Sequence, residues 1–164
     1  MIFETERLII RRLNVEDLDA FHKLESNANV LKYAIGNPKS YIENEIELKA
    51  LILKYNIPKN DFRVYAIIRK TDNQFIGTVA LVKDNLDDEI GYRFLEEFWN
   101  LGFGSEVCFG LVSYCKQIKI KYIIAYVVDE NKASAIILQK NNFMIVNEFI
   151  NDENQPETKY VLKL

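Results

Sequence analysis

Hydrophobic and polar positions alternate with two different periods along this chain, and the switch between the periods predicts an ordered series of elements. Runs rich in β-branched and aromatic residues predict strands at 7–13, 62–69, 75–82, 89–95, 122–128, 143–150 and 158–162. Apolar positions three or four apart predict helices at 15–24, 41–52, about 104–119 and about 132–141. The three strands between 62 and 95 are separated by short turns and predict an antiparallel meander. The later strand–helix–strand order implies one locally parallel pair.

Capping residues place the starts of two of these helices. Asn14 can cap the first helix, and Ser40 with Glu43 forms a capping-box pattern at the start of the second. A break around residues 27–38 separates them. The apolar stripe expected on the second helix consists of Ile42, Ile46, Leu48, Leu51 and Ile52.

Composition narrows the class of protein. The chain has 164 residues, and a length of this size predicts one domain, covering 1–164. Its net charge of −3 argues against a nucleic-acid partner, because binding phosphates needs a basic face. No apolar run approaches the ~20 residues of a membrane helix, and the acidic start does not resemble a signal peptide. We therefore expect a cytoplasmic protein with no membrane partner.

The two cysteines and the one histidine carry no predicted chemistry. Cys108 and Cys115 are seven residues apart on a predicted helix, too far for a disulfide within it. A zinc site of Cys/His type is not expected with one histidine, and no metal is predicted. His22 is interpreted as a surface or cleft-lining residue, because no nucleophile is placed beside it.

The most informative segment follows the strand 89–95. The loop contains two glycines and opens a helix, so that several main-chain N–H groups face outward where the helix dipole favours an anion. This predicts a seat for a pyrophosphate. The proposed cradle runs from Trp99 through Ser105. The predicted cofactor-binding residues in and before it are Phe94, Leu95, Trp99, Leu101, Gly102, Phe103, Gly104 and Ser105. Glu106 in the first turn is interpreted as compensating the dipole rather than as a catalyst.

These motifs resemble the GNAT superfamily of acyl-CoA-dependent N-acetyltransferases. Gly102 and Gly104 match the small positions of the family's Q/R-x-x-G-x-G/A loop, and Trp99 resembles the branch that acetylates ribosomal-protein N-termini. The start Glu4-Thr5-Glu6-Arg7, the strand motif Glu89-Ile90-Gly91-Tyr92 and the helix motif Asn131-Lys132-Ala133-Ser134 are also similar to that branch. Asn142 departs from the usual glycine after the last helix, but Asn tolerates a left-handed terminus.

The resemblance implies an α/β (α+β) fold. The expected fold has a mixed, mostly antiparallel central sheet of six to seven strands, with helices on both faces. It also implies acetyl-CoA as cosubstrate and an amine acceptor, either a polypeptide N-terminus or a small molecule. A homodimer is left open beside a monomer.

The chemistry of amide formation suggests roles for three positions. An amine must be neutral to attack a thioester, and Glu89 could take its proton directly or through water. A main-chain N–H around Phe94 would face the thioester oxygen, and we expect a bulge or splay beside this strand so that the pantetheine pairs like an added strand. The resemblance implies that Asn131 contacts CoA and that Ser134 lies near the sulfur. Many relatives have a tyrosine where Leu138 stands, so the proton donor to the thiolate is Ser134, a water or no dedicated group.

The sequence also bears on two other functions. A non-catalytic acyl-CoA-binding sensor of the same fold remains open, although Glu89, Asn131 and Ser134 are present. A dinucleotide oxidoreductase is excluded, because the loop lacks the third glycine and follows an antiparallel sheet. Glu43, Glu45 and Glu47 favour a solvated helix face, and Tyr33 and Tyr41 are placed to line an acceptor pocket.

Overall fold

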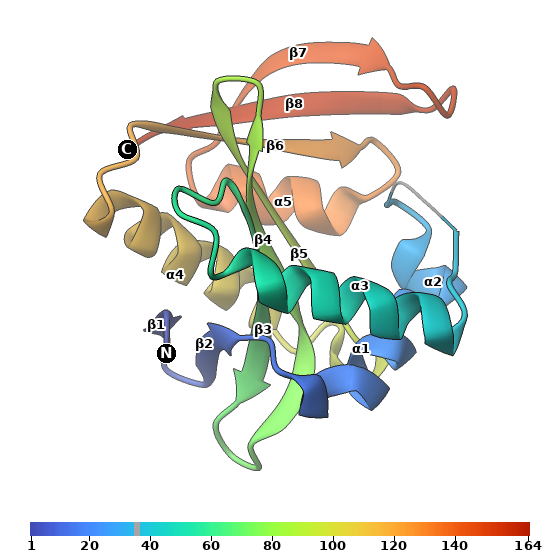
Figure 1. Ribbon diagram of the computed structural model, residues 1–164. Coiled ribbons are helices and arrows are strands. Elements are labelled where there is room, and N and C mark those ends of the chain that lie inside the picture. The colour runs from blue at the N-terminus through green and yellow to red at the C-terminus, as the bar shows by residue number, and fades with distance from the viewer. Residues whose placement is uncertain (35–36) are drawn as a thin grey trace.

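The computed structural model describes residues 1–34 and 37–164 and contains a single eight-stranded sheet (Figure 1). The sheet order is β1-β2-β3-β4-β5-β6-β8-β7. The strands are β1 (Phe3–Glu4), β2 (Leu8–Arg12), β3 (Phe62–Arg69), β4 (Gln74–Asp84), β5 (Asp87–Phe94), β6 (Tyr122–Val128), β7 (Met144–Ile150) and β8 (Pro156–Lys163). The helices are α1 (Leu18–Glu25), α2 (Ala28–Leu31), α3 (Tyr41–Lys54), α4 (Phe103–Gln117) and α5 (Lys132–Lys140). Two short 3-10 turns complete the set, η1 (Val15–Asp17) and η2 (Glu96–Phe98).

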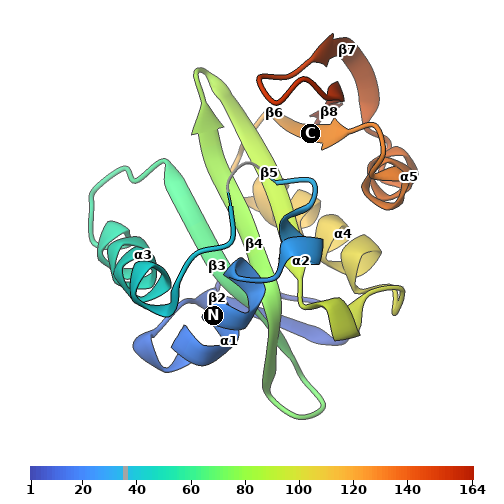
Figure 2. The same cartoon turned by 90° about the vertical axis from the view of Figure 1, so that its right-hand side faces the viewer.

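The sheet opens in its middle. Strands β5 and β6 form the one parallel pair, and they pair only at Asp88 with Ile123 and Glu89 with Ile124. Beyond that point β5 continues to Phe94 along β4, while β6 turns away to pair with β8 (Figure 2). The predicted splay between these two strands is therefore present.

Helices cover both faces of the sheet. Figure 2 shows α1 and α3 on one side of the central strands and α4 with α5 on the other. The core fills both interfaces with fully buried side chains, among them Leu24 from α1, Leu48 from α3 and Leu111 from α4. Gly77 permits the close approach of β4 to β5, because an added Cβ would lie 2.1 Å from the carbonyl oxygen of Arg93.

The sequence predicted the element order and most caps. Asn14 and Ser40 both form capping boxes, and Asn142 has a φ of 65° after α5. The sheet has one strand more than expected, because the two-residue β1 is too short for a periodic signal. Helix α2 lies inside the predicted break, in which residues 35 and 36 fall outside the described residues.

The predicted apolar stripe on α3 is partly wrong. Ile42 and Ile46 are 68% and 64% exposed, whereas Leu48 and Leu51 are buried. The helix rotates these two leucines onto the sheet, and Asn44 is fully buried beside them. Among the described helices, none is long and apolar enough to cross a membrane.

Candidate functional site

The glycine loop ends in a helix start whose main-chain donors are free. Asn100 and Gly102 both adopt positive φ, 60° and 81°, and Gly102 is the N-cap of α4 without any side-chain hydrogen bond. The first main-chain bond that closes the helix runs from the Glu106 N–H to the Gly102 carbonyl. The N–H groups of Phe103, Gly104 and Ser105 therefore lie ahead of the first helical bond, as in any helix N-terminus. This geometry suits an anion.

The N-terminal segment braces this loop. One oxygen of Glu106 accepts from the Thr5 hydroxyl at 2.6 Å and from the Arg7 N–H at 2.7 Å, and the other accepts from Arg7 Nε at 2.6 Å. Arg7 also donates to the Leu101 carbonyl at 3.0 Å and stacks over the Phe103 ring. Burial alone would raise the pKa of Glu106, but these donors together hold it below its ordinary value.

Glu106 therefore does more than its predicted role of compensating the dipole. It fixes the end of the loop to a segment about a hundred positions earlier in the chain.

Trp99 ties the loop to the end of β5. Its indole N–H donates to the Phe94 carbonyl at 2.9 Å, while the Leu95 N–H bonds to Ile76 on β4. Hydrogen-bonding directions alternate along an antiparallel pair, so Phe94 directs its N–H and C=O away from β4, toward the splay. The side chains of Phe94 and Leu95 are buried in the core.

A buried hydroxyl lies between this loop and α5. The Tyr92 ring faces Gly104, and an added Cβ on Gly104 would lie 2.8 Å from Ile137 on α5. The Tyr92 hydroxyl oxygen is buried and forms no well-aligned hydrogen bond within residues 1–34 and 37–164. Burial raises the pKa of Tyr92, and the neighbouring Ser134 hydroxyl offsets part of that rise.

Asn131 and Ser134 form the first turn of α5. The Asn131 side chain caps the helix by accepting from the Ser134 N–H at 3.2 Å. The structure therefore brings Ser134 to the same side of β5 as Gly104. Tyr92 was part of the motif read in the sequence, but no role was assigned to it. Strand alternation was the signal available, because it places Tyr92 on the face opposite Glu89.

Glu89 lies on the other face of β5 in an acidic neighbourhood. Burial is the main cause that raises the pKa of Glu89, and the charges of Asp84 and Glu157 raise it further, whereas Lys159 lowers it. Lys159 itself pairs with Asp87 at 3.0 Å. A carboxylate with a raised pKa is a better base than an ordinary one.

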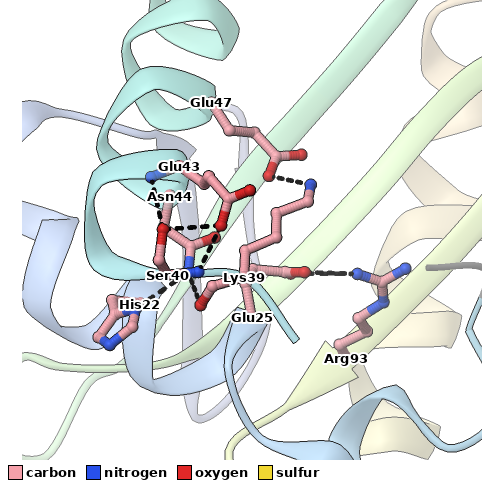
Figure 3. Close-up of polar contacts among 8 residues, drawn as sticks. All are labelled: His22, Glu25, Lys39, Ser40, Glu43, Asn44, Glu47 and Arg93. Atoms are coloured by element: carbon pink, nitrogen blue, oxygen red, sulfur yellow. Dashed lines mark hydrogen bonds and ion pairs between the residues drawn. The ribbon is translucent and has the colours of Figure 1, made fainter. Parts of the chain in front are cut away.

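Two further residues of β5 share the face of Glu89. Among the described residues, no atom lies within 4 Å of where a Cβ on Gly91 would lie, so these residues leave room beside the strand there. Arg93 follows, and its Nη1 donates to both oxygens of Glu25 at 2.9 and 3.1 Å (Figure 3). Within the described ranges, no acceptor bonds to Nε or Nη2 of Arg93. The open strip is thus bounded by a carboxylate at one end and by a guanidinium at the other.

Polar contacts at the start of α3 lie on the same side of the sheet as the Glu25–Arg93 pair. Figure 3 shows Lys39 reaching Glu47 near the Glu25–Arg93 pair, while His22 contacts the Asn44 amide at 2.9 Å. Tyr41 packs edge-on against His22 and donates to Asp19 at 2.8 Å. The ring of Tyr33 lies under the ammonium group of Lys32. None of these tyrosine contacts involves Glu89.

Cys108 and Cys115 are fully buried free thiols, and burial raises the pKa of each to about 12. They are core residues. A cavity of about 310 Å³ lies beyond Glu106, between Phe3 and Tyr114, but none of the predicted cofactor-binding residues lines it. Over the two described ranges, no three His, Cys, Asp or Glu side chains are grouped as metal ligands.

Comparisons with known proteins agree on one family. The family model described as "Acetyltransferase (GNAT) domain" matches residues 7–144. An uncharacterized N-acetyltransferase of Bacillus subtilis (strain 168), YoaA, is 34% identical over 147 residues, which cover 87% of this chain and 82% of the relative.

Solved structures share the fold. The RimL ribosomal L7/L12 alpha-N-protein acetyltransferase in complex with coenzyme A superposes with a TM-score of 0.85 at 18% identity, over 98% of this chain and 96% of the other. Spermidine N-acetyltransferase from Vibrio cholerae, in complex with CoA and spermine, gives a TM-score of 0.80 at 22% identity, over 96% and 95% of the two chains.

Proposed function

Because the chain belongs to the GNAT acetyltransferase family, we propose that it moves an acetyl group from acetyl-CoA to a primary amine by direct attack in a ternary complex. One observation carries this proposal: the same strand–loop–helix unit contains both the main-chain N–H groups at the start of α4 and the half-buried carboxylate of Glu89 on β5. The two lie on opposite faces of β5, so donor and acceptor can approach from different sides.

The residues of the loop face fit coenzyme A. The N–H groups of Phe103, Gly104 and Ser105 would bind its pyrophosphate, in the loop tied by Trp99 to Phe94. The Tyr92 hydroxyl is buried without a well-aligned partner in the described chain, and a polar ligand passing Ser134 would supply one. Asn131 would contact the CoA arm from the start of α5. Beyond Glu89, β5 no longer pairs with β6. The pantetheine would form main-chain hydrogen bonds with this edge of β5.

Glu89 would act as the general base. Burial raises its pKa, which makes the carboxylate more basic than a solvated one, so that it can accept the ammonium proton through water. The Phe94 N–H would bind the pantetheine arm rather than the thioester oxygen, because Phe94 is five residues, or about 17 Å, along the strand from Glu89. Ser134 is placed to protonate the departing thiolate.

The acceptor that best fits the open strip is a polypeptide N-terminus. Glu89 and Arg93 are four residues apart, which is about 13 Å along a strand. An extended chain lying over Gly91 could place its terminal amine at Glu89 and a carbonyl oxygen at the free nitrogens of Arg93. The RimL relative in the comparisons is described as a protein N-terminal acetyltransferase, which supports the same class.

A small polyamine is the second candidate. Asp84 and Glu157 lie close enough to Glu89 to raise its pKa, and carboxylates attract a polycation. The Vibrio cholerae structural neighbour is named for spermidine.

A kinetic comparison of acceptors tests the proposal. Acetyl transfer would be measured with a short peptide, the same peptide blocked at its N-terminus but containing lysine, and spermidine. We expect the free peptide to have the highest kcat/KM, and Arg93→Gln to lower it for the peptide but not for spermidine. Spermidine as the best substrate would overturn the peptide assignment. CoA binding without turnover on any amine would instead support the non-catalytic module.

A further inference from the structure

A second polar cavity lies far from the glycine loop, where α3 ends and β3 begins. Its volume is about 200 Å³, and its walls include Arg12 at the end of β2, Lys59 and Asn60 before β3, and Arg63 on β3. Tyr55 and Tyr65 form an aromatic wall, with their rings stacked at 5.9 Å. No aspartate or glutamate lines this cavity in the described chain.

The arginines of the chain differ in whether a carboxylate pairs with them. Of the six arginines, four pair with carboxylates: Arg7, Arg11, Arg69 and Arg93. Arg12 and Arg63 have no carboxylate partner among the described residues, and both line this cavity. Lys59 lacks one as well. In a protein with a net charge of −3, three cations facing one cavity without an anion are an electrostatic imbalance that a ligand could relieve.

The arginine side chains are held in place by uncharged groups. Arg63 Nε donates to the Asn60 carbonyl at 2.9 Å, and its two terminal nitrogens bond to no acceptor among residues 1–34 and 37–164. The guanidinium of Arg12 lies over the Tyr55 ring, 5.3 Å from the centroid. Tyr55 is fixed in turn, because its hydroxyl accepts from the Leu13 N–H at 3.0 Å and donates to the Val64 carbonyl.

One carboxylate near the Tyr55 ring, Asp17, is already paired with another arginine. Asp17 raises the pKa of Tyr55, whereas Arg12 lowers it, so both charges lie near that ring, although burial is the main cause of the raised pKa. Both oxygens of Asp17 accept from Arg11, at 2.7 and 2.8 Å. Asp17 is therefore not available to neutralise Arg12 or Arg63.

We propose that this cavity binds a phosphoryl dianion, either inorganic phosphate or the phosphate of a small monoester. Two guanidinium groups present paired donors that match phosphate oxygens, and the Lys59 ammonium adds a third charge. At roughly 30 Å³ per water, a volume of this size holds about six waters, enough for a phosphoryl group with a short organic stem. A carboxylate would leave two of the three cations uncompensated.

This site is separate from the glycine loop. Among the described residues, none from the loop between β5 and α4 and none from α4 lines this cavity. A ligand in the cavity would not overlap a pyrophosphate at the start of α4, and the proposal does not depend on the activity proposed above.

Calorimetric titration of the purified protein, saturated with CoA to fill the loop, would test the site. Inorganic phosphate and glycerol 3-phosphate are added at constant ionic strength, with chloride as the reference anion. We expect saturable phosphate binding that weakens at least tenfold in Arg12→Gln and in Arg63→Gln. Lys140→Gln is the matched control. It removes the same charge from α5, outside the cavity, and should leave phosphate binding unchanged.

The remaining outcomes also decide. Tighter binding of the monoester than of phosphate identifies an organic ligand, and equal binding identifies the free anion. Arg12→Lys, which keeps the charge but loses the paired donors, should bind more weakly than the wild-type protein and more tightly than Arg12→Gln. Absence of saturation at 20 mM phosphate (about physiological excess), or equal affinity in both arginine variants and the control, would overturn the proposal. Circular dichroism of each variant separates loss of the site from loss of the fold.

Discussion

The two faces of β5 are built in different ways. On the face toward α4, the candidate site consists mainly of main-chain groups: the N–H groups at the start of α4, the Phe94 N–H and the capped first turn of α5. On the face toward α1, it consists of side chains from separate segments, Glu89 and Arg93 from β5 and Glu25 from α1. A main-chain site tolerates many sequences, whereas a side-chain site changes with single substitutions. The acceptor face is therefore where relatives of one fold can diverge in substrate.

The largest expected effect is that of Glu89→Gln. It should lower kcat by about 10²–10⁴ while leaving CoA affinity unchanged, because the role we propose for this carboxylate is proton transfer on the acceptor face. Stopped-flow acetyl transfer and CoA titration measure the two quantities. Asp88→Asn is the control, since the neighbouring carboxylate points to the opposite face and pairs with Lys83. A CoA affinity that falls with the rate would show that the two faces are not separable.

The pH dependence of the same variant gives a second readout. The folded-state pKa of Glu89 is raised, so the wild-type rate should rise with pH through a value above the ordinary one of glutamate. Burying the ionised form also lowers stability as the pH rises from the unfolded-state pKa through the folded-state pKa, because the native state holds the proton more tightly than the unfolded chain over that interval. Glu89→Gln should remove the acid limb of the rate profile and slightly raise stability at neutral pH.

Two glycines provide a matched pair of substitutions for the two faces. Gly102→Ala places a Cβ at a φ of 81°, which costs about 1–2 kcal/mol and should weaken CoA binding by roughly tenfold. Gly91→Ala meets no atom within 4 Å, so stability and CoA affinity should not change. The added methyl group would stand in the open strip and raise the acceptor KM. Opposite results for the two alanines would reverse the assignment of donor and acceptor faces.

The Glu25–Arg93 pair gives a smaller effect. Glu25 is buried, but the Arg93 side chain is 37% exposed, so solvent reduces the strength of the pair to about 1 kcal/mol. Glu25→Gln should lower stability by that amount and raise the KM for a peptide acceptor, because Arg93 loses its anchor. CoA affinity should stay constant. Thermal denaturation and acceptor kinetics on Glu25→Gln, Arg93→Gln and the double variant form a cycle, and additive effects would show that the pair does not act as a unit.

The sequence predicted the local backbone conformations around the candidate site better than the long-range side-chain contacts. Gly102, Asn131 and Asn142 lie in local conformations that each residue type signals by itself, a positive φ or a helix cap. The fold followed from periodicity in the same way. The Glu25–Arg93 contact joins residues 68 positions apart, and no local pattern encodes such a pair.

Two other features could not be predicted from the sequence for the same reason. The unpartnered hydroxyl of Tyr92 depends on how α5 packs against α4, which strand alternation does not determine. The cavity between Arg12 and Arg63 needs β2, β3 and the end of α3 in one place. Even within α3, the predicted burial of Ile46 was wrong. The spacing of apolar residues does not determine which edge of the stripe packs against the sheet.

The smallest expected effect concerns the brace on the loop. Donors from Thr5 and Arg7 lower the pKa of Glu106 in the folded protein, so its contribution to stability is present above the unfolded-state pKa and is lost as the pH falls through the folded-state pKa. Because Arg7 is 42% exposed, we expect this contribution to be below about 1 kcal/mol. Glu106→Gln should therefore flatten the acid limb of the stability profile, measured by urea denaturation from about pH 3 to about pH 7, a range that includes the ordinary pKa of glutamate. The variant should also weaken CoA binding modestly while leaving acceptor KM unchanged, because Glu106 orders only the loop on the α4 face. An effect on the acceptor alone would mean that the N-terminal segment supports the other face of β5.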